Sequence, residues 1–318
     1  MMSKTQDPDK RQSQVIIIYG PTSTGKTNLA LRLSKKYNGE IISADSRQVY
    51  KNLDIGSGKV DLERRVKKNK GYWVVDGIKI HGFDIAKPGD NFSVYDFIKY
   101  TSLKIKNITS LGKRPVIAGG TGFYISSLIN GLHSAGIGPN EKLRKQLLKL
   151  SRDDLYKKLQ SLDWAKAGSL NNSDKNNPRR LIRAIEISLS KQKATVSKHP
   201  VVNYNLIGLS APNKFLFSKS DEWLETRFEK IVEEIKNLIS TGVDEKWIDN
   251  LGLEYRWISR YVLGKISRDV SKTKLKRDQH AFIRRQKTWF GKFKNAEIFD
   301  VSKNGWQQEL EKDNLNMI

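Results

Sequence analysis

Cysteine is absent from this chain of 318 residues, and histidine occurs only four times. Without cysteine, neither a disulfide nor a thiolate metal site can form. The four histidines lie at no spacing typical of metal ligands. The sequence therefore offers no metal centre of the cysteine or histidine type.

Long apolar runs are also lacking. No segment approaches the length of a membrane span. The first residues are polar and of mixed charge, without the apolar stretch of a secretory signal, so we interpret residues 1–14 as a disordered tail. With 37% apolar and 29% charged residues, the chain is typical of a globular protein with a polar surface. We expect it to be cytoplasmic, to bind no membrane and to be a monomer.

Acidic residues are few relative to basic ones, which gives a formal net charge of +24. The surplus is concentrated in two regions. Residues 142–198 hold fifteen Lys and Arg against five Asp and Glu, and residues 255–294 hold thirteen against two. Such local surpluses indicate a partner that is a polyanion larger than a nucleotide. The alternative is a set of exposed helices whose lysines serve only solubility.

Strands and helices alternate along much of the chain. Strands are predicted at 15–19, 40–43, 114–118, 204–209 and 296–299, and a helix at Ser93–Ser110 with Phe97, Leu103 and Ile108 among its inward positions. This alternation predicts an α/β fold, a doubly wound parallel sheet of the P-loop type. Ligands bind such sheets at the carboxyl ends of the strands.

The strand pattern stops between residues 138 and 204. A capping box at Ser151–Asp154 and a strongly basic helix over Asn177–Leu189 predict helices here. We therefore divide the chain into a catalytic core, residues 15–138 and 204–318, and an inserted helical domain, residues 139–203.

A complete P-loop follows the first strand. Its residues are Gly20, Pro21, Thr22, Ser23, Thr24, Gly25, Lys26 and Thr27. In this motif backbone N–H groups converge on phosphate oxygens, the lysine neutralises the terminal phosphate and the last hydroxyl binds Mg²⁺. The segment is expected to bind a diphosphate or triphosphate, with Mg²⁺ as cofactor.

Phosphoryl transfer normally also requires an acidic residue at the end of a later strand. Here the strand at 114–118 ends in Gly119-Gly120-Thr121, without a carboxylate. This argues against a kinase or ATPase without excluding either. In place of a carboxylate the loop has the hydroxyl of Thr121, and we expect the backbone and side chain of this residue to approach one phosphate group of the ligand.

Asp45 begins the segment Asp-Ser-Arg-Gln-Val-Tyr, directly after the second strand. Phosphate would repel this carboxylate, so it suits a general base for an incoming nucleophile better than a phosphate ligand. The structural alternative is that Asp45 only caps the following turn.

These segments resemble the tRNA dimethylallyltransferases. The matching stretches are GPTSTGKT, EIISADSRQVYKNLDIGSGK, GGTGFYISSLINGL, NPRRLIRAIEI and RRQKTWF, in family order from about residue 15 to 300. The resemblance implies that the P-loop holds dimethylallyl diphosphate and not ATP. It also implies transfer of the prenyl group to N6 of adenine 37, beside the tRNA anticodon.

The resemblance further assigns roles to single residues. Asp45 would be the general base, Thr121 a hydrogen-bond donor to the bridging oxygen, and Arg227 a cation that stabilises the leaving diphosphate, together with Lys26 of the P-loop. The residues expected to contact the tRNA are Asp45, Ser46, Arg47, Gln48, Arg179, Arg180, Leu181, Ile182 and Arg183. The helical insertion would bind the anticodon stem-loop.

The acceptor base must leave its stack to react. Tyr50, Phe123 or Tyr124 are candidates to stack on it, although packing in the core suits each of them better. One departure from the family lies at Gly252-Leu-Glu-Tyr-Arg256, where many members read Gly-Tyr-Lys-Glu. We expect it to affect local tRNA contacts and not the chemistry. The alternatives are an adenylate isopentenyltransferase and a P-loop small-molecule kinase.

Overall fold

The computed structural model describes residues 14–59, 64–131, 137–190, 203–293 and 296–314. The predicted tail, apart from Gln14, lies outside these residues, as does the end of the predicted insertion. Within the described residues one sheet contains eight strands: β1 (Val15–Tyr19), β2 (Gly39–Ser43), β3 (Val66–Asn69), β4 (Tyr72–Val75), β5 (Ile78–His81), β6 (Arg114–Gly119), β7 (Tyr204–Ser210) and β8 (Glu297–Asp300).

The sheet has the order β3-β4-β5-β2-β6-β1-β7-β8. All pairs from β5 to β8 are parallel, and Ile16 of β1 lies opposite Val116 of β6. β1 and β2 are buried along their whole length, as expected of strands covered on both faces. The predicted α/β fold of the P-loop type, with a mostly parallel sheet, is confirmed.

Two antiparallel pairs at one edge of the sheet were not predicted. β3 pairs with β4, and β4 pairs with β5. The turn between β4 and β5 is Asp76-Gly77, and both residues have positive φ, 49° and 84°. These are the conformations of a type I′ hairpin turn.

Four helices flank the strands: α1 (Lys26–Lys36), α2 (Val94–Ser110), α3 (Gly122–Asn130) and α13 (Trp306–Asn314). α1 and α13 contribute Leu29, Leu33 and Leu310 to a cluster with Ile16 and Ile18 on one face of the sheet. α2 packs against β2 and β6 and shares no described residue with that cluster.

Helix α2 begins with the capping box Ser93–Asp96, and its residues Phe97 and Ile108 are buried as predicted. The prediction for Leu103 was wrong, because this side chain is 57% exposed. The buried stripe runs through Phe97, Thr101, Ile105 and Ile108. Leu103 lies two residues before Ile105, on the opposite side of the helix.

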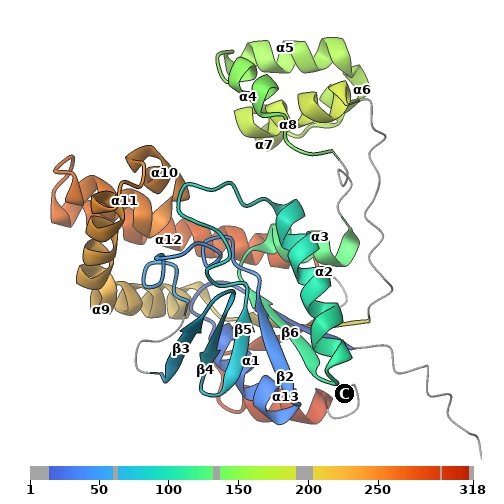
Figure 1. The fold of residues 1–318 in the computed structure, drawn as a ribbon, viewed down its shortest axis with the longest axis vertical. Helices are drawn as coiled ribbons and strands as arrows, with labels where there is room; N and C mark the ends of the chain where they lie inside the picture. The colour runs from blue at the N-terminus through green and yellow to red at the C-terminus, as the bar shows by residue number, and fades with distance from the viewer. Residues whose placement is uncertain (1–13, 60–63, 132–136, 191–202, 294–295, 315–318) are drawn as a thin grey trace, which may run out of the picture. The chain divides into compact units, whose positions relative to one another are not determined.

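The segment between β7 and β8 is helical. It forms α9 (Asn213–Ser240), α10 (Glu245–Leu251), α11 (Leu253–Val262) and α12 (Arg268–Phe290), which gather beside the sheet in Figure 1. Their apolar faces share one core with Val49, Leu53 and Ala86 from the loops that follow β2 and β5. The sheet and these helices are therefore joined through the loop after β2.

The chain divides into two compact units, residues 1–129 with 200–318, and residues 130–199. The second unit contains five described helices: α4 (Glu141–Leu147), α5 (Arg152–Leu162), α6 (Trp164–Ser169), α7 (Asn172–Lys175) and α8 (Pro178–Leu189). The predicted cap of α5 at Ser151 is confirmed. The predicted basic helix is α8, and Asn177 caps its amino end. In the part of the chain that is described, no helix has the length and apolar character needed to cross a membrane.

Candidate active site

Three loops meet at the carboxyl ends of neighbouring strands. The P-loop follows β1, Asp45 comes shortly after β2, and Gly120-Thr121 follow β6. Because β2, β6 and β1 are adjacent in the sheet, the loops lie side by side. The position agrees with the rule for ligand sites of parallel sheets.

The P-loop has the conformation of an anion-binding turn. Gly25, with φ 78°, precedes the first residue of α1, so the amino end of this helix faces the loop. The Thr24 hydroxyl donates to the Pro21 carbonyl over 2.8 Å, and the Lys26 ammonium donates to the same oxygen over 2.7 Å. Gly20 permits a close approach to β7, because a Cβ here would lie 2.3 Å from the Leu209 carbonyl oxygen.

Lys26 is half-buried, and its ammonium donates into the P-loop. Burial lowers the pKa of its ammonium to about 8, against the opposing attraction of Asp45. The lysine therefore faces a carboxylate across the site while lacking full hydration. An anion bound beside it would restore the stability of its charged form.

The first cavity, of about 300 Å³, lies over the P-loop. Its lining brings together residues distant in sequence: Thr22, Ser23, Gly25, Lys26, Thr27, Asn28, Asp45, Gln48, Gly56, Ser57, Gly58, Arg64, Ala118, Gly119, Gly120, Ser220, Trp223, Arg227, Glu254 and Gln279. Five of the predicted P-loop residues, together with Asp45 and Arg227, thus share one cavity. Its cations and helix terminus suit a polyphosphate.

A second cavity, of about 250 Å³, adjoins the same residues on the side of α12. Its walls are more aromatic: Thr22, Asp45, Ser46, Arg47, Gly56, Ser57, Gly120, Thr121, Gly122, Phe123, Leu253, Glu254, Phe282, Arg285, Gln286, Trp289 and Phe290. Asp45 and Gly120 line both cavities. The Asp45 carboxylate therefore lies between a cavity lined by the P-loop and a cavity lined by aromatic side chains.

Asp45 is oriented by its own turn, because its carboxylate accepts the N–H of Arg47 over 2.9 Å. The hydroxyl of Thr121 accepts the N–H of Ser46 over 3.0 Å. Asp45 and Thr121 are thus brought into one corner by a direct contact between their loops. Both line the second cavity.

Arg47 and Gln48 have partners inside the protein. The Arg47 guanidinium donates to the Leu251 carbonyl. The Gln48 amide accepts from the Ser43 hydroxyl over 2.6 Å and donates to the carbonyls of Ser57 and Gly58. These side chains join the loop after β2 to its neighbours, and their contact with tRNA stays a prediction.

Arg227 reaches the first cavity from α9, and its guanidinium lies over the Trp223 ring at 5.4 Å. Stacking of this kind holds the planar group in place without using all its donors. The position fits a role beside a leaving diphosphate. That role remains a prediction here.

Glu254 is a second carboxyl group at the site that sequence reasoning did not find. It lines both cavities and accepts a hydrogen bond from Gln279 Nε2 over 2.8 Å. Burial raises its pKa above the ordinary value, and Arg47 opposes this while Asp45 adds to it. The departure from the family pattern at 252–256 was the available signal, because Glu254 lies within it and lines both cavities.

Helix α12 supplies further residues that sequence reasoning did not assign to the site. Gln286 accepts the N–H of Thr22 over 3.0 Å and donates to the Gly120 carbonyl over 2.9 Å, so it joins the P-loop to the loop after β6. Trp289 lies against Gly122, where an added Cβ would be 2.2 Å from the indole ring. The segment RRQKTWF, already noted for its resemblance, was the available signal.

The three aromatic residues considered for stacking on the acceptor base differ in burial. Tyr50 and Tyr124 are buried, and Tyr124 stacks on Phe97 with ring centroids 4.2 Å apart. Core packing is therefore their role. Phe123 is 49% exposed and lines the second cavity. It is the candidate left to contact a base.

The predicted tRNA-binding residues of α8 lie in the second unit. Arg179 and Arg180 are exposed at its amino end, and Arg180 pairs with Asp174. Leu181 and Ile182 are buried in the core of this unit, so their side chains support the helix and are not available to an RNA.

Arg183 also serves the interior of the second unit. It donates to Glu186 and to the Ile137 carbonyl. Burial alone would raise the pKa of Glu186, but Arg144, the Asn140 N–H and Arg183 lower it below its ordinary value. The basic helix is thus anchored through a buried carboxylate.

Comparison with known proteins gives the family. A family model described as IPP transferase matches residues 48–293. The chain belongs to the IPP transferase family. The tRNA dimethylallyltransferase of Endomicrobium trichonymphae is 37% identical over 289 residues, which cover 89% of this chain and 93% of that protein. This confirms the resemblance inferred from the sequence and the interpretation of the chain as a transferase.

Solved structures of the family have the same fold. The full-length tRNA isopentenylpyrophosphate transferase from Bacillus halodurans is 28% identical with a TM-score of 0.68, covering 96% of both chains. The tRNA delta(2)-isopentenylpyrophosphate transferase from Staphylococcus epidermidis is 31% identical with a TM-score of 0.66, covering 96% of this chain and 98% of the other. As a member of the family, the chain is similar to these transferases over nearly its whole length.

Proposed function

We propose that this chain transfers the dimethylallyl group of dimethylallyl diphosphate to N6 of adenine 37 in tRNA, releasing diphosphate. The observation that carries the proposal is the position of Asp45 between two adjoining cavities. One has the cations and backbone donors of a P-loop, and the other has aromatic walls. The first suits a diphosphate and the second suits an adenine beside a short apolar chain.

In this reaction the N6 lone pair attacks C1 of the allyl group, the bond from C1 to the bridging oxygen breaks, and its electrons leave with the diphosphate. The N6 proton passes to Asp45. Lys26 and Arg227 neutralise the charge of the leaving group, and Thr121 donates its hydroxyl hydrogen to the bridging oxygen. An allylic diphosphate ionises readily once its charge is neutralised, so positioning and electrostatics supply the catalysis.

Mg²⁺ is the proposed cofactor, to be held by one protein hydroxyl together with the substrate's phosphates and water. Among the described residues no group of three or more His, Asp or Glu could hold a metal ion. The Thr27 hydroxyl lines the first cavity, and Mg²⁺ commonly combines one such protein ligand with substrate phosphates and water. When bound, the ion would neutralise diphosphate charge.

The proposed acceptor is the anticodon stem-loop, with the helical unit as its binding site. That unit carries the exposed arginines of α8 within the basic region 142–198. The relatives are named for their action on tRNA. We propose that the monomer binds the stem-loop there and accepts adenine 37, extruded from its stack, in the second cavity.

The decisive experiment supplies purified protein with dimethylallyl diphosphate and unmodified tRNA, followed by digestion and mass analysis of the nucleosides. Prenylated adenosine at position 37 is the expected product. Prenylation of free AMP at a comparable rate would favour an adenylate isopentenyltransferase. Hydrolysis of ATP with phosphorylation of a small molecule, and no prenylation, would favour a kinase.

Asp45→Asn tests the base. We expect turnover to fall by at least about 100-fold, since general base catalysis contributes about 10² to 10⁴, while the Kd for tRNA stays within about two-fold. Single-turnover prenylation and a filter-binding titration give the two values. Near-normal turnover would remove Asp45 from the role of base.

A further inference from the structure

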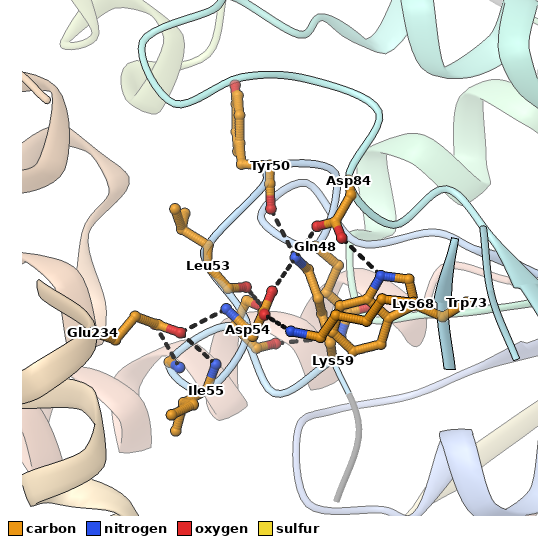
Figure 2. A network of polar contacts seen from close by, with 12 residues as sticks. Gln48, Tyr50, Leu53, Asp54, Ile55, Lys59, Lys68, Trp73, Asp84 and Glu234 are labelled. Atoms are coloured by element: carbon orange, nitrogen blue, oxygen red, sulfur yellow. Dashed lines mark hydrogen bonds and ion pairs between the residues drawn. The ribbon is translucent and has the colours of Figure 1, made fainter. Parts of the chain in front are cut away.

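The loop after β2 is bound by a carboxylate from α9. The backbone N–H groups of Asp54, Ile55 and Gly56 donate to the Glu234 carboxylate over 2.6, 2.7 and 3.1 Å. The Tyr255 hydroxyl donates to the same group over 2.9 Å. Figure 2 shows Glu234 reaching from its helix to this turn. Each carboxylate oxygen thus accepts two hydrogen bonds.

The same loop is held on its other side. Lys59 is fully buried and donates to Asp54, Asp84 and the Tyr50 carbonyl, each over 2.6 to 2.8 Å (Figure 2). Gln48 binds the carbonyls of Ser57 and Gly58. These contacts come from residues within about thirty positions of the loop. Glu234, by contrast, is about 180 positions away.

The loop is a wall of the site. Gly56 and Ser57 line both cavities, and Gly58 lines the first. Packing behind the wall is tight, since a Cβ added to Gly56 would lie 2.9 Å from Tyr255 Cζ. A displacement of this turn would therefore change the width of both cavities.

Helix α9 bears two relevant residues seven positions apart, which is about two helical turns and the same side of the helix. Arg227 lines the first cavity, and Glu234 binds the loop that forms another part of its wall. We infer that Glu234 is a positioning residue, which fixes the separation between the loop 53–58 and α9 so that Arg227 faces the bound diphosphate. The inference rests on the proposed function.

The chemistry of the contact requires a carboxylate. Four donors converge on Glu234, and an amide oxygen accepts two hydrogen bonds at most. Glu234→Gln would leave at least two donors without an acceptor and bring an NH₂ group against them. Glu234→Asp keeps the charge but is shorter by one methylene.

The test compares four variants with the wild-type protein. Glu234→Gln should lower kcat/KM for dimethylallyl diphosphate by about 10- to 100-fold, since a displacement of about 1 Å costs up to about 10², with the KM for tRNA unchanged within about two-fold. Glu234→Asp and Tyr255→Phe should give values of kcat/KM between those of Glu234→Gln and the wild-type protein. Glu233→Gln is the matched control, because Glu233 is exposed on the same helix and pairs with Lys236.

Titration with inorganic diphosphate separates this inference from the proposed function. Glu234→Gln should bind it about 10-fold more weakly than wild type, whatever the acceptor. A folded Glu234→Gln protein with kcat/KM and diphosphate affinity within about two-fold of wild type would overturn the inference. If that variant does not fold, Tyr255→Phe decides by the same limits. Absence of prenylated adenosine with wild-type protein would overturn the proposed function alone.

Discussion

At Lys26, burial and the proposed diphosphate would shift the pKa of the ammonium in opposite directions. Burial lowers its pKa to about 8, so at neutral pH most molecules carry the cation and above pH 8 most do not. A diphosphate beside the ammonium stabilises the charged form and raises its pKa again. Ligand binding is then coupled to proton uptake at alkaline pH.

From this coupling we expect the affinity for dimethylallyl diphosphate to fall as pH rises through about 8, by up to tenfold per pH unit. Calorimetric titration in buffers of different ionisation enthalpy, from about pH 7 to 9.5, measures both affinity and proton uptake. In Lys26→Arg the cation cannot lose its proton in this range, so the pH dependence should disappear. A wild-type affinity that is flat across pH 8 would contradict the assignment of Lys26 to the phosphate.

Burial shifts the pKa of Glu254 in the other direction, because this residue is an acid and its pKa is raised. Between the pKa of the unfolded chain, about 4.3, and the higher folded value, the folded protein keeps a proton that the unfolded chain releases. Stability therefore decreases as pH rises through this interval. Above the pKa of Glu254 in the folded protein, the full loss of stability from burying its charged carboxylate is present.

Glu254→Gln should therefore raise the free energy of unfolding at neutral pH and remove this part of its pH dependence. At acidic pH, where wild-type Glu254 is protonated, the two proteins should be alike. Denaturant titrations at several pH values measure the difference. Glu233→Gln, at an exposed position, should show no such gain, and an equal gain in both variants would point to net charge as the cause.

At the level of elements, the local sequence pattern predicted those strands and helices whose formation depends on neighbouring residues. β1, β2 and β6 are buried apolar runs, and Ser151 caps the start of α5 as predicted. The edge strand β3 is lysine-rich and half exposed, so its pattern is weak. The Asp76-Gly77 pair is a hairpin signal in the sequence, although no strands were predicted on either side of it.

Long-range packing explains what could not be predicted. Residues 204–318 were assigned to the α/β core, but α9 to α12 form a helical layer. Only the packing of this layer brings Glu254 and Gln286 to the P-loop side, beside Arg227, which the family resemblance had already assigned. The predicted Lys26, Asp45 and Thr121 lie within motifs at strand ends. Glu254 has no motif of its own, because its place depends on Gln279 of another helix.

Helix α8 allows a test at this level, because Arg179 and Arg180 are exposed while Arg183 serves the interior. Reversing both exposed charges, Arg179→Glu with Arg180→Glu, should weaken tRNA binding. The slope of log K against log salt should lose about 1.4 to 1.8 in magnitude if two phosphate contacts are lost. Binding titrations at four or more salt concentrations give the slope.

The matched control is Lys219→Glu with Lys236→Glu, which makes the same change in net charge on α9. Its slope should stay close to wild type. Equal slopes for wild type and the α8 variant would mean that this helix does not contact the RNA backbone. Equal losses in both double variants would assign the effect to net charge and not to α8.

For the whole molecule, the charge distribution separates two kinds of ligand. Two segments, 142–198 and 255–294, hold most of the net charge of +24. The first belongs mainly to the smaller unit, and the second includes α12, which supplies Arg285 to the second cavity. The proposed diphosphate would occupy one cavity, whereas a nucleic acid can contact many cations at once.

We therefore expect wild-type affinity for tRNA to fall by about 100-fold or more between about 50 and 200 mM salt, as for proteins that make several phosphate contacts. Affinity for dimethylallyl diphosphate should change by less than about tenfold over the same range, because the half-buried Lys26 is screened less than exposed cations. Titrations of both ligands against one protein preparation measure the contrast. Equal salt dependences for the two ligands would contradict the expected difference. If AMP were also prenylated efficiently, the result would favour the adenylate isopentenyltransferase alternative.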